Sequence, residues 1–373
     1  MKLREKEFTP QKRRSNVKKW LRKVIFNYNK TKKKKKSLRG KAKKHTDFYK
    51  IIAPTILDLY KPQNHKPMVE FVTEIEKRAT KGTKKNPAGI HICFRNTKYI
   101  TSAAGVWLLA CMENLKANFP NTIFRVTRPP QTPIAKGHKK LYPIVDSVLN
   151  RIGFYSAIGL KKREMIEVPH VKCWEVSKGS IVAGEIIGKL LESVTQITGR
   201  DYKSLYRPLL EATANSVEHA YHPEVYSLPQ PATKWWCFAA IMNNKLITLV
   251  CDLGVGIPKT LPKTQGKGFF ERIAKLIGHP FTEDCHFIRG ALEVKRTNTE
   301  LDHRGKGGTD LQSIIEQTEG SQLRILSNRG LLKIVNNGYK KVRSSGLDNA
   351  KSISGTIVEW SVALPVEDTK CQK

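Results

Sequence analysis

The sequence predicts an α/β protein with two folded domains behind a basic tail. Its 373 residues are 39% hydrophobic, which is enough for two ordinary cores. Strand-like and helix-like segments alternate between residues 90 and 154, a pattern that indicates a small α/β sandwich. A second such stretch places glycine-rich turns after a strand and before a helix. We expect a tail at 1–46, a first domain at 50–160, a linker at 161–179, a second domain at 180–366 and a C-terminal tail at 367–373.

Basic residues are concentrated in the N-terminal tail. The chain has 67 Lys and Arg against 32 Asp and Glu, a formal charge of +35, and residues 1–50 hold 21 of the basic residues against three acids. Apolar residues recur at helical spacing around Trp20, and residues 32–36 are an unbroken lysine run, so we expect an amphipathic basic helix and a charged tether. Such a tail can be a solvated arm, can capture nucleic acid through phosphate charge, or can bind an anionic membrane surface. We favour nucleic acid over the membrane.

No apolar run reaches the length of a membrane span, and the basic N-terminus lacks the continuous apolar stretch of a secretory signal, so we expect a cytoplasmic protein. The seven cysteines are scattered without a C-x-x-C pair. This spacing argues against a disulfide framework and against a structural zinc site built on such pairs. We expect the cysteines to be buried small hydrophobic residues.

The first domain is expected to contain strands at 90–94 and 122–126 and helices at 104–119 and 142–154. Over residues 89–160 the segments IHICFRNTKYITSAAGVWLLACMENL, TIFRV and VLNRIGFYSAIGL resemble a STAS domain, the anti-sigma-factor-antagonist module. The resemblance implies a helix that begins at an Asp-Ser-Ser-Gly-like turn with a phosphorylated serine. Here Ser102-Ala103-Ala104-Gly105 occupies that turn, Ala104 stands at the acceptor position, and the aspartate is missing. We therefore expect an interaction scaffold, with Thr101 or Ser102 acting as an N-cap.

The second domain carries three polar side chains along one side of a helix expected at residues 201–221. Glu211, Asn215 and His219 recur every four residues, each displaced by only ~40° around the helix axis. An ordinary surface helix also shows a polar stripe opposite its core face. The stripe alone therefore does not distinguish a site from a solvated surface.

Two glycine-rich turns follow this helix. A hairpin expected at residues 235–251 runs into the segment DLGVGIP, in which Gly254 and Gly256 permit a sharp turn and close backbone approach to a ligand. Asp252, at the strand end, can accept a hydrogen bond from an amino group such as that of adenine. The segment RGKGGTD at 304–310 then opens an apolar-periodic helix, and such loops present backbone N–H groups to phosphate. Residues 321–338 and 354–365 alternate as strands.

Together, EATANSVEHAY, DLGVGIP, RGKGGTDLQSI and SGTIVEWSVALP resemble the GHKL ATPase domain of gyrase, heat-shock chaperones, mismatch-repair ATPases and histidine kinases. The resemblance implies a two-layer α/β sandwich that binds ATP and Mg²⁺ between its helices and one face of a mixed sheet, under a mobile lid. It implies that Asn215 is the Mg²⁺ ligand, Glu211 the general base and Asp252 the adenine-binding carboxylate. The other implied contacts are the turn glycines Gly254 and Gly256, the lid residues Gly305, Lys306, Gly307 and Gly308, and Thr356, which helps to hold adenine. We expect His219 to pack or hydrogen-bond within its helix.

Within this family, the compact anti-sigma serine kinases, which work with STAS partners, are the nearest in organisation. None of the ten histidines is followed by Asp or Glu, as a histidine-kinase acceptor would be, and no transducer domain is expected after residue 364. We expect an ATP-binding regulatory switch with slow hydrolysis that controls binding to a partner protein or nucleic acid. The alternative is a serine/threonine protein kinase acting on a separate STAS-type partner. Intact Glu211, Asn215 and Asp252 weigh against a third possibility, a degenerate nucleotide-binding scaffold.

Overall fold

The computed structural model describes residues 47–133, 137–161, 168, 172–227, 230–242, 244–264, 268, 270–271, 274–275, 278, 280–297, 307–338 and 342–364. The chain divides into two units, Met1–Asp47 and Phe48–Lys373. The expected tail helix around Trp20, the lysine run and the C-terminal tail lie outside the described residues. Both expected folded domains belong to the second unit. No helix among the described residues is long and apolar enough to cross a membrane.

The first part of this unit is a small α/β arrangement around a three-stranded parallel sheet with the order β1-β3-β5. The expected strands correspond to β3 and β5, and the expected helices to α3 and α4, with a break at Gly153, whose φ is +86°. The strands are β1 (Phe48–Ile52), β2 (Ile56–Leu57), β3 (Gly89–Cys93), β4 (Tyr99–Ile100), β5 (Ile123–Thr127), β6 (Thr132–Pro133) and β7 (Leu141–Tyr142); the helices are α2 (Pro62–Ala79), α3 (Ser102–Asn118), α4 (Ile144–Arg151) and α5 (Phe154–Ala157).

Helix α3 is apolar around most of its circumference, and this composition is explained by its position between the large sheet and the helices of the first part. Thr101 is its N-cap, as expected, and the Thr101 hydroxyl accepts the N–H of Ala104 at 3.3 Å. Residues on several sides of the helix, including Trp107 and Met112, are buried. The helix contacts β9 and β10 of the large sheet as well as the first part's own helices. It therefore lies in one core that the first part shares with the large sheet.

The second part is built on a seven-stranded sheet with the order β13-β12-β11-β14-β10-β9-β8. Every pair within it is antiparallel, which corrects the mixed sheet that the GHKL resemblance implies. Tight turns join β9 to β10 and β11 to β12, and such connections produce antiparallel neighbours. Its strands are β8 (Lys172–Gly179), β9 (Trp235–Met242), β10 (Lys245–Asp252), β11 (Gln322–Ser327), β12 (Gly330–Asn336), β13 (Val342–Asp348) and β14 (Thr356–Ala363). Strand β8 lies within residues 161–179, where we expected only a linker.

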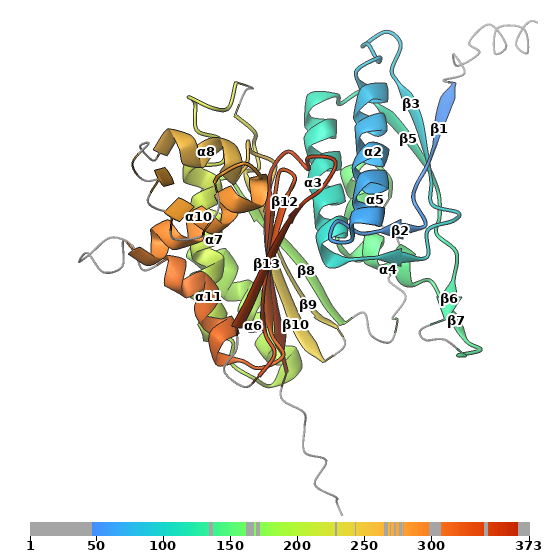
Figure 1. The fold of residues 1–373 in the computed structure, drawn as a ribbon. Coiled ribbons are helices and arrows are strands. Elements are labelled where there is room, and N and C mark those ends of the chain that lie inside the picture. Colours follow the sequence, from blue (N-terminus) through green and yellow to red (C-terminus); the bar gives the residue numbers. More distant parts are fainter. Residues whose placement is uncertain are drawn as a thin grey trace, which may run out of the picture. The chain divides into compact units, whose positions relative to one another are not determined.

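Helices cover one face of the large sheet, and the first part covers the other (Figure 1). The side chains of β9 alternate accordingly, since Trp235 belongs to the helical core and Trp236 to the core shared with α3. The expected domains therefore pack as one body without an intervening gap in the core. The helical layer comprises α6 (Gly184–Thr198), the 3₁₀ turn η1 (Lys203–Leu205), α7 (Tyr206–Glu218), α8 (Ile257–Thr264), α10 (Asp284–Thr297) and α11 (Gly307–Gln317).

A buried ion pair lies where the two parts meet. Glu359 on β14 is 2% exposed, and its carboxylate accepts hydrogen bonds from Arg324 at 2.9 Å and from the Ser102 hydroxyl at 3.0 Å. Burial raises the pKa of Glu359, while Arg324 and Ser102 act in the opposite direction. Ser102, at the start of α3, is thus tied to the large sheet.

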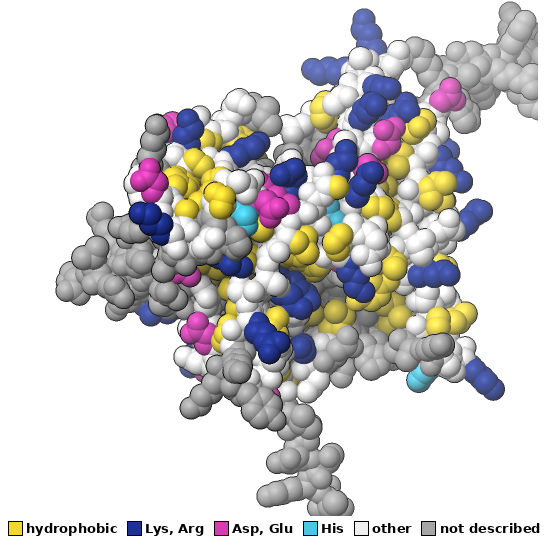
Figure 2. All heavy atoms as spheres, in the orientation of Figure 1, with side chains coloured by type: hydrophobic (Ala, Val, Ile, Leu, Met, Phe, Trp, Pro, Cys, Tyr) yellow, Lys and Arg dark blue, Asp and Glu magenta, His cyan; other side chains and the backbone are white. Residues whose placement is uncertain are grey.

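Basic side chains are spread over the surface of the described residues. On the face shown in Figure 2, Lys and Arg side chains are scattered among hydrophobic and neutral polar ones and do not gather into a single patch. The five cysteines whose side chains the structure describes, Cys93, Cys111, Cys237, Cys251 and Cys285, are buried and free, as expected. Among the described residues on this face, no basic surface is as concentrated as the tail sequence.

Candidate functional site

Segments that are far apart in the sequence meet around one cavity of about 310 Å³ between the large sheet and its helical layer. Asn215 on α7, Asp252 at the end of β10, Gly256 in the following turn and Thr356 at the start of β14 all line it. The apolar part of the wall is formed by residues of the sheet and of helices α8, α10 and α11, among them Val250, Leu261, Ile288, Leu292 and Leu311. Four of the ten expected site residues are therefore brought together.

Asp252 is the buried carboxyl group of this cavity. It is 5% exposed, and β10 places it opposite Thr356 on the neighbouring strand. Its Oδ1 accepts the backbone N–H of Gly254 at 2.9 Å, and its Oδ2 lies 3.4 Å from the donating Ser216 hydroxyl. Burial raises the pKa of Asp252 to about 7, and these hydrogen bonds only partly oppose the effect. The carboxyl group is thus held in place by hydrogen bonds that only partly stabilise its negative charge.

The turn after Asp252 requires glycine at two positions. A Cβ on Gly254 would lie 2.3 Å from the carbonyl oxygen of Ala220, so no side chain fits between this turn and the end of α7. Gly256 has φ +83°, and a Cβ there would lie 2.7 Å from Asn328 Nδ2. The Asn328 amide in turn donates to the carbonyl of Val255 at 3.0 Å. Gly254 therefore supports the turn without lining the cavity, whereas Gly256 does both.

Thr356 is held by a serine on the adjacent strand. The hydroxyls of Ser327 and Thr356 lie 2.9 Å apart, and Ser327 Oγ also accepts the N–H of Ile257 at 2.9 Å. Ser327 thus links β14 to the first residue of α8. This contact ties the floor of the cavity to the turn that follows Asp252.

Helix α7 presents only part of the expected polar stripe to the cavity. The helix runs from Tyr206 to Glu218 after the η1 turn, which is shorter than the expected 201–221. Asn215 and His219 line the cavity, but Glu211 does not. The Asn215 amide nitrogen donates to Glu211 Oε1 at 3.3 Å. Glu211 is therefore placed beside the cavity, in contact with one of its lining residues.

The expected lid is described only at its end. Gly305 and Lys306 lie outside the described residues, so their expected phosphate contacts stay predictions. Gly307 and Gly308, expected in the lid loop, are the first two residues of α11, so the helix begins within the glycine-rich segment rather than after it. The helix then reaches the cavity with Leu311.

Several supporting residues were missed by the sequence analysis. Ser216 contacts Asp252, Ser327 and Asn328 hold the turn, and the Tyr221 hydroxyl accepts the N–H of Leu253 at 2.9 Å. Ser216 directly follows Asn215, so its position was a usable signal. Ser327 and Asn328 end a strand that is remote in sequence, and only the strand order brings them to the site.

Comparisons of the chain with protein-family models, with curated proteins and with solved structures find no significant match. The function must therefore be inferred from the chemistry of the residues around the cavity.

Proposed function

We propose that the large sheet and its helical layer form a GHKL-type ATP-binding domain, and that the protein is a nucleotide-dependent regulatory switch with slow ATP hydrolysis. One observation carries this proposal. Residues expected from three separate motifs, Asn215, Asp252 with Gly256, and Thr356, line a single cavity. Their sequence separation makes this convergence a property of the fold rather than of local sequence.

The donor and acceptor groups of the cavity fit an adenine. Asp252 supplies a buried acceptor for the exocyclic amino group, and the hydroxyl of Thr356 lies on the adjacent strand. Val250 and Ile288 contribute apolar surface for a flat ring. The cavity of about 310 Å³ is near the lower end of small-ligand pockets, roughly 300–1,000 Å³. It suits a base and sugar, with the phosphates directed toward the start of α11.

Asn215 fits the role of a Mg²⁺ ligand. Its amide nitrogen faces Glu211, so the carbonyl oxygen is the atom suited to a hard cation. Bound Mg²⁺ would neutralise phosphate charge while keeping several waters. Glu211, one helical turn earlier, is the group that would accept a proton from the attacking water. Its position outside the cavity lining is compatible with action through an intervening water.

The first part fits a STAS-like scaffold rather than a phosphoacceptor. Ala104 stands at the position of the family's acceptor serine and is fully buried. Ser102 is 3% exposed, and its hydroxyl is engaged by Glu359. A kinase could not reach either position without moving α3 away from the sheet. These contacts support a structural role for this part within the same chain.

The turn that lines the nucleotide cavity also touches the first part. A second cavity, of about 350 Å³, is lined by Leu253, Gly254 and Val255 on one side and by α2 and α3 residues such as Glu76 and Trp107 on the other. Within this turn, Asp252 and Gly256 line the first cavity, and the three residues between them line the second. A ligand that shifts this turn would change the contacts of α2 and α3, which is how we propose the switch reports nucleotide binding to a partner protein.

The proposal is tested by calorimetry with ATP and Mg²⁺, followed by incubation with γ-labelled ATP alone and with a cell extract. We expect ATP binding that is lost in Asp252→Asn and that no longer depends on Mg²⁺ in Asn215→Ala. Labelled phosphate release would support the slow ATPase, and label on a second protein would favour the serine/threonine kinase alternative. Normal ATP affinity in Asp252→Asn would refute the adenine assignment.

A further inference from the structure

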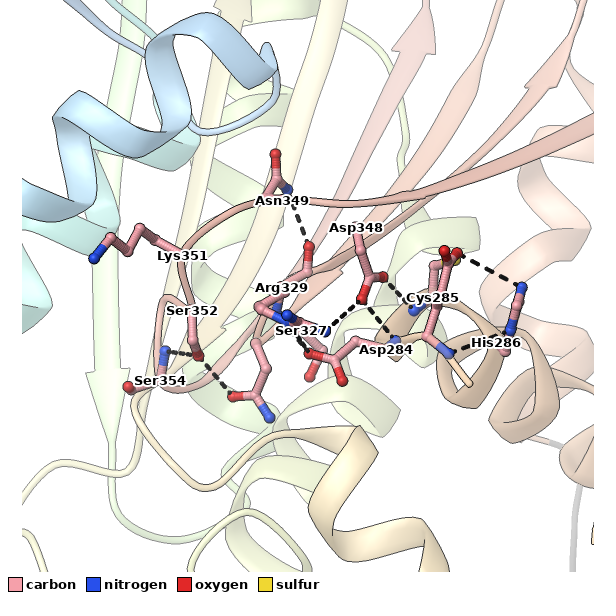
Figure 3. A network of polar contacts seen from close by, with 12 residues as sticks. Asp284, Cys285, His286, Ser327, Arg329, Asp348, Asn349, Lys351, Ser352 and Ser354 are labelled. Atoms are coloured by element: carbon pink, nitrogen blue, oxygen red, sulfur yellow. Dashed lines mark hydrogen bonds and ion pairs between the residues drawn. The ribbon is translucent and has the colours of Figure 1, made fainter. Parts of the chain in front are cut away.

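A cluster of metal-ligating side chains lies at the start of α10, apart from the polar groups of the nucleotide cavity. Glu283, Cys285 and His286 offer an oxygen, a sulfur and a nitrogen that all lie within 4.8 Å of one another. Figure 3 shows Cys285 and His286 at the beginning of this helix, next to Asp348. Cys285 is buried, His286 is half-buried, and Glu283 is exposed. The cluster thus has a protected sulfur and an open side.

The distances between these atoms are close to those of a tetrahedral metal site. Cys285 Sγ lies 3.6 Å from Glu283 Oε2, and His286 Nε2 lies 3.8 Å from the same oxygen. Zinc bonds of about 2.3 Å to sulfur and about 2.0–2.2 Å to nitrogen and oxygen place a sulfur–oxygen pair about 3.5–3.7 Å apart and a nitrogen–oxygen pair about 3.3–3.5 Å apart at tetrahedral angles. Small side-chain rotations would bring the three donors to one ion. Contiguous sequence alone does not produce this convergence, because the helix start must hold the backbone in place.

The backbone of the cluster is fixed by a neighbouring carboxylate. Asp348, at the end of β13, accepts the N–H groups of Asp284 and Cys285, both at 2.9 Å. Arg329 pairs with Asp348 at 3.3 Å, and its N–H donates to Asp284 at 3.0 Å. The two carboxylates thus fix the backbone from which the side chains of Glu283, Cys285 and His286 extend. Such outer contacts orient metal ligands in proteins.

We propose that Glu283, Cys285 and His286 form a binding site for a borderline-soft divalent cation, Zn²⁺ in the first place, with water as the fourth ligand. Mixed sulfur, nitrogen and oxygen donors suit Zn²⁺ and exclude Mg²⁺ and Ca²⁺, which take oxygen ligands. His286 Nδ1 faces the N–H of Glu283 at 3.4 Å. Binding through Nε2 places the ring proton on Nδ1, so this long contact is given up.

The site would anchor one wall of the nucleotide cavity. Ile288, Ala291 and Leu292 line that cavity and follow His286 on the same helix. A cation that joins Glu283 to α10 would stiffen the start of this helix. The metal site does not depend on the proposed function, because it requires only the three donors and the contacts of Asp348.

The test uses the full chain after removal of metal by a chelator, titrated with Zn²⁺ against a chromophoric chelator and separately with Co²⁺. We expect each chain to bind one Zn²⁺ ion tightly, and the Co²⁺ form to show a thiolate-to-cobalt charge-transfer band. Cys285→Ser should remove the band, and His286→Ala should weaken Zn²⁺ binding by at least the about 10–100-fold that loss of an outer partner costs. Zinc should also raise the unfolding temperature of the wild-type protein.

Matched controls separate this cluster from the other thiols and imidazoles. Cys371→Ser and His222→Ala should retain both the tightly bound Zn²⁺ ion and the cobalt band. Glu283→Gln alters an exposed side chain, so it should preserve the far-ultraviolet circular dichroism while weakening Zn²⁺ binding. The proposal is overturned if Cys285→Ser, folded by circular dichroism, still binds one Zn²⁺ ion tightly. It is also overturned if the Co²⁺ form shows no charge-transfer band, or if Cys371→Ser loses the band as completely as Cys285→Ser. If Cys285→Ser does not fold, unchanged Zn²⁺ affinity in Glu283→Gln overturns it.

Discussion

The buried Asp252 carboxyl group should make the protein less stable as the pH rises from about 5 to about 8. Burial raises its pKa from 3.8 to about 7 in the folded protein, and the unfolded chain releases the proton near the ordinary value. Between these values the folded state binds more protons than the unfolded state, so stability is lost as the pH rises through about 7. Asp252→Asn removes the titrating group and should remove this part of the pH dependence.

The size of the effect follows from the two pKa values. At pH 5 the unfolded chain has already released this proton. The folded protein keeps it up to about pH 7, so the two states differ by about one bound proton over about two pH units. At about 1.4 kcal/mol per unit, the wild-type protein should lose about 2–3 kcal/mol that the Asp252→Asn variant keeps. Solvent screens the charge of Asp252 little, because the residue is only 5% exposed.

The assay is urea unfolding at pH 5 and at pH 8, followed by circular dichroism and tryptophan fluorescence so that non-coincident transitions are detected. The difference in unfolding free energy between Asp252→Asn and wild type should grow by about 2–3 kcal/mol in favour of the variant from pH 5 to pH 8. Other titrating groups are common to both proteins and cancel in this difference. A free-energy difference that stays constant, or that moves in favour of the wild type, would refute the raised pKa of the buried Asp252.

Three further predictions concern turnover, the turn and the tail. Glu211→Gln should keep ATP affinity in calorimetry but lose phosphate release by ~10²–10⁴-fold, and unchanged release would exclude a general base at this position. Gly256→Ala should cost about 1–3 kcal/mol in urea unfolding and abolish ATP binding, because its φ is +83° and Asn328 occupies the space of a Cβ; Gly188→Ala, which meets nothing within 4 Å, is the matched control and should be neutral or stabilising. In salt titrations with duplex DNA or RNA, log affinity should fall by ~0.9 per phosphate contacted for each unit of log salt, and deletion of residues 1–46 should flatten this slope. Tight binding to anionic vesicles without salt-sensitive nucleic-acid binding would instead indicate a membrane target for the tail.

Local patterns predicted the strands and turns that carry the candidate site. The β9–β10 hairpin follows from its two apolar runs and the Asn-Asn turn between them, and β10 ends at Asp252 as expected. The glycine-rich segment 304–310 predicted that a helix follows, and α11 begins within that segment at Gly307. These features depend on residues that are adjacent in the sequence, so the sequence predicts them directly.

The strand order and the shared core could not be read in the same way. β14 lies between β10 and β11, which brings Thr356 to Asp252 and Ser327 to Thr356, and no local signal specifies this insertion. The segment containing β8 was expected to be a linker, and its strand carries several charged and polar residues, yet it completes the sheet edge. Helix α3 was expected only as an element of the first domain, but its burial on several sides shows that it also packs on the large sheet. Tertiary partners, not local preference, decide these placements.

The central claim is that the cavity beside Asp252 binds the adenine of ATP. A crystal or cryo-electron-microscopy structure of the full chain with a non-hydrolysable ATP analogue and Mg²⁺ tests it most directly. We predict the adenine amino group within hydrogen-bond distance of the Asp252 carboxylate, with the phosphates on the Asn215 side. A nucleotide bound elsewhere, or an adenine that contacts neither Asp252 nor Thr356, would contradict the account.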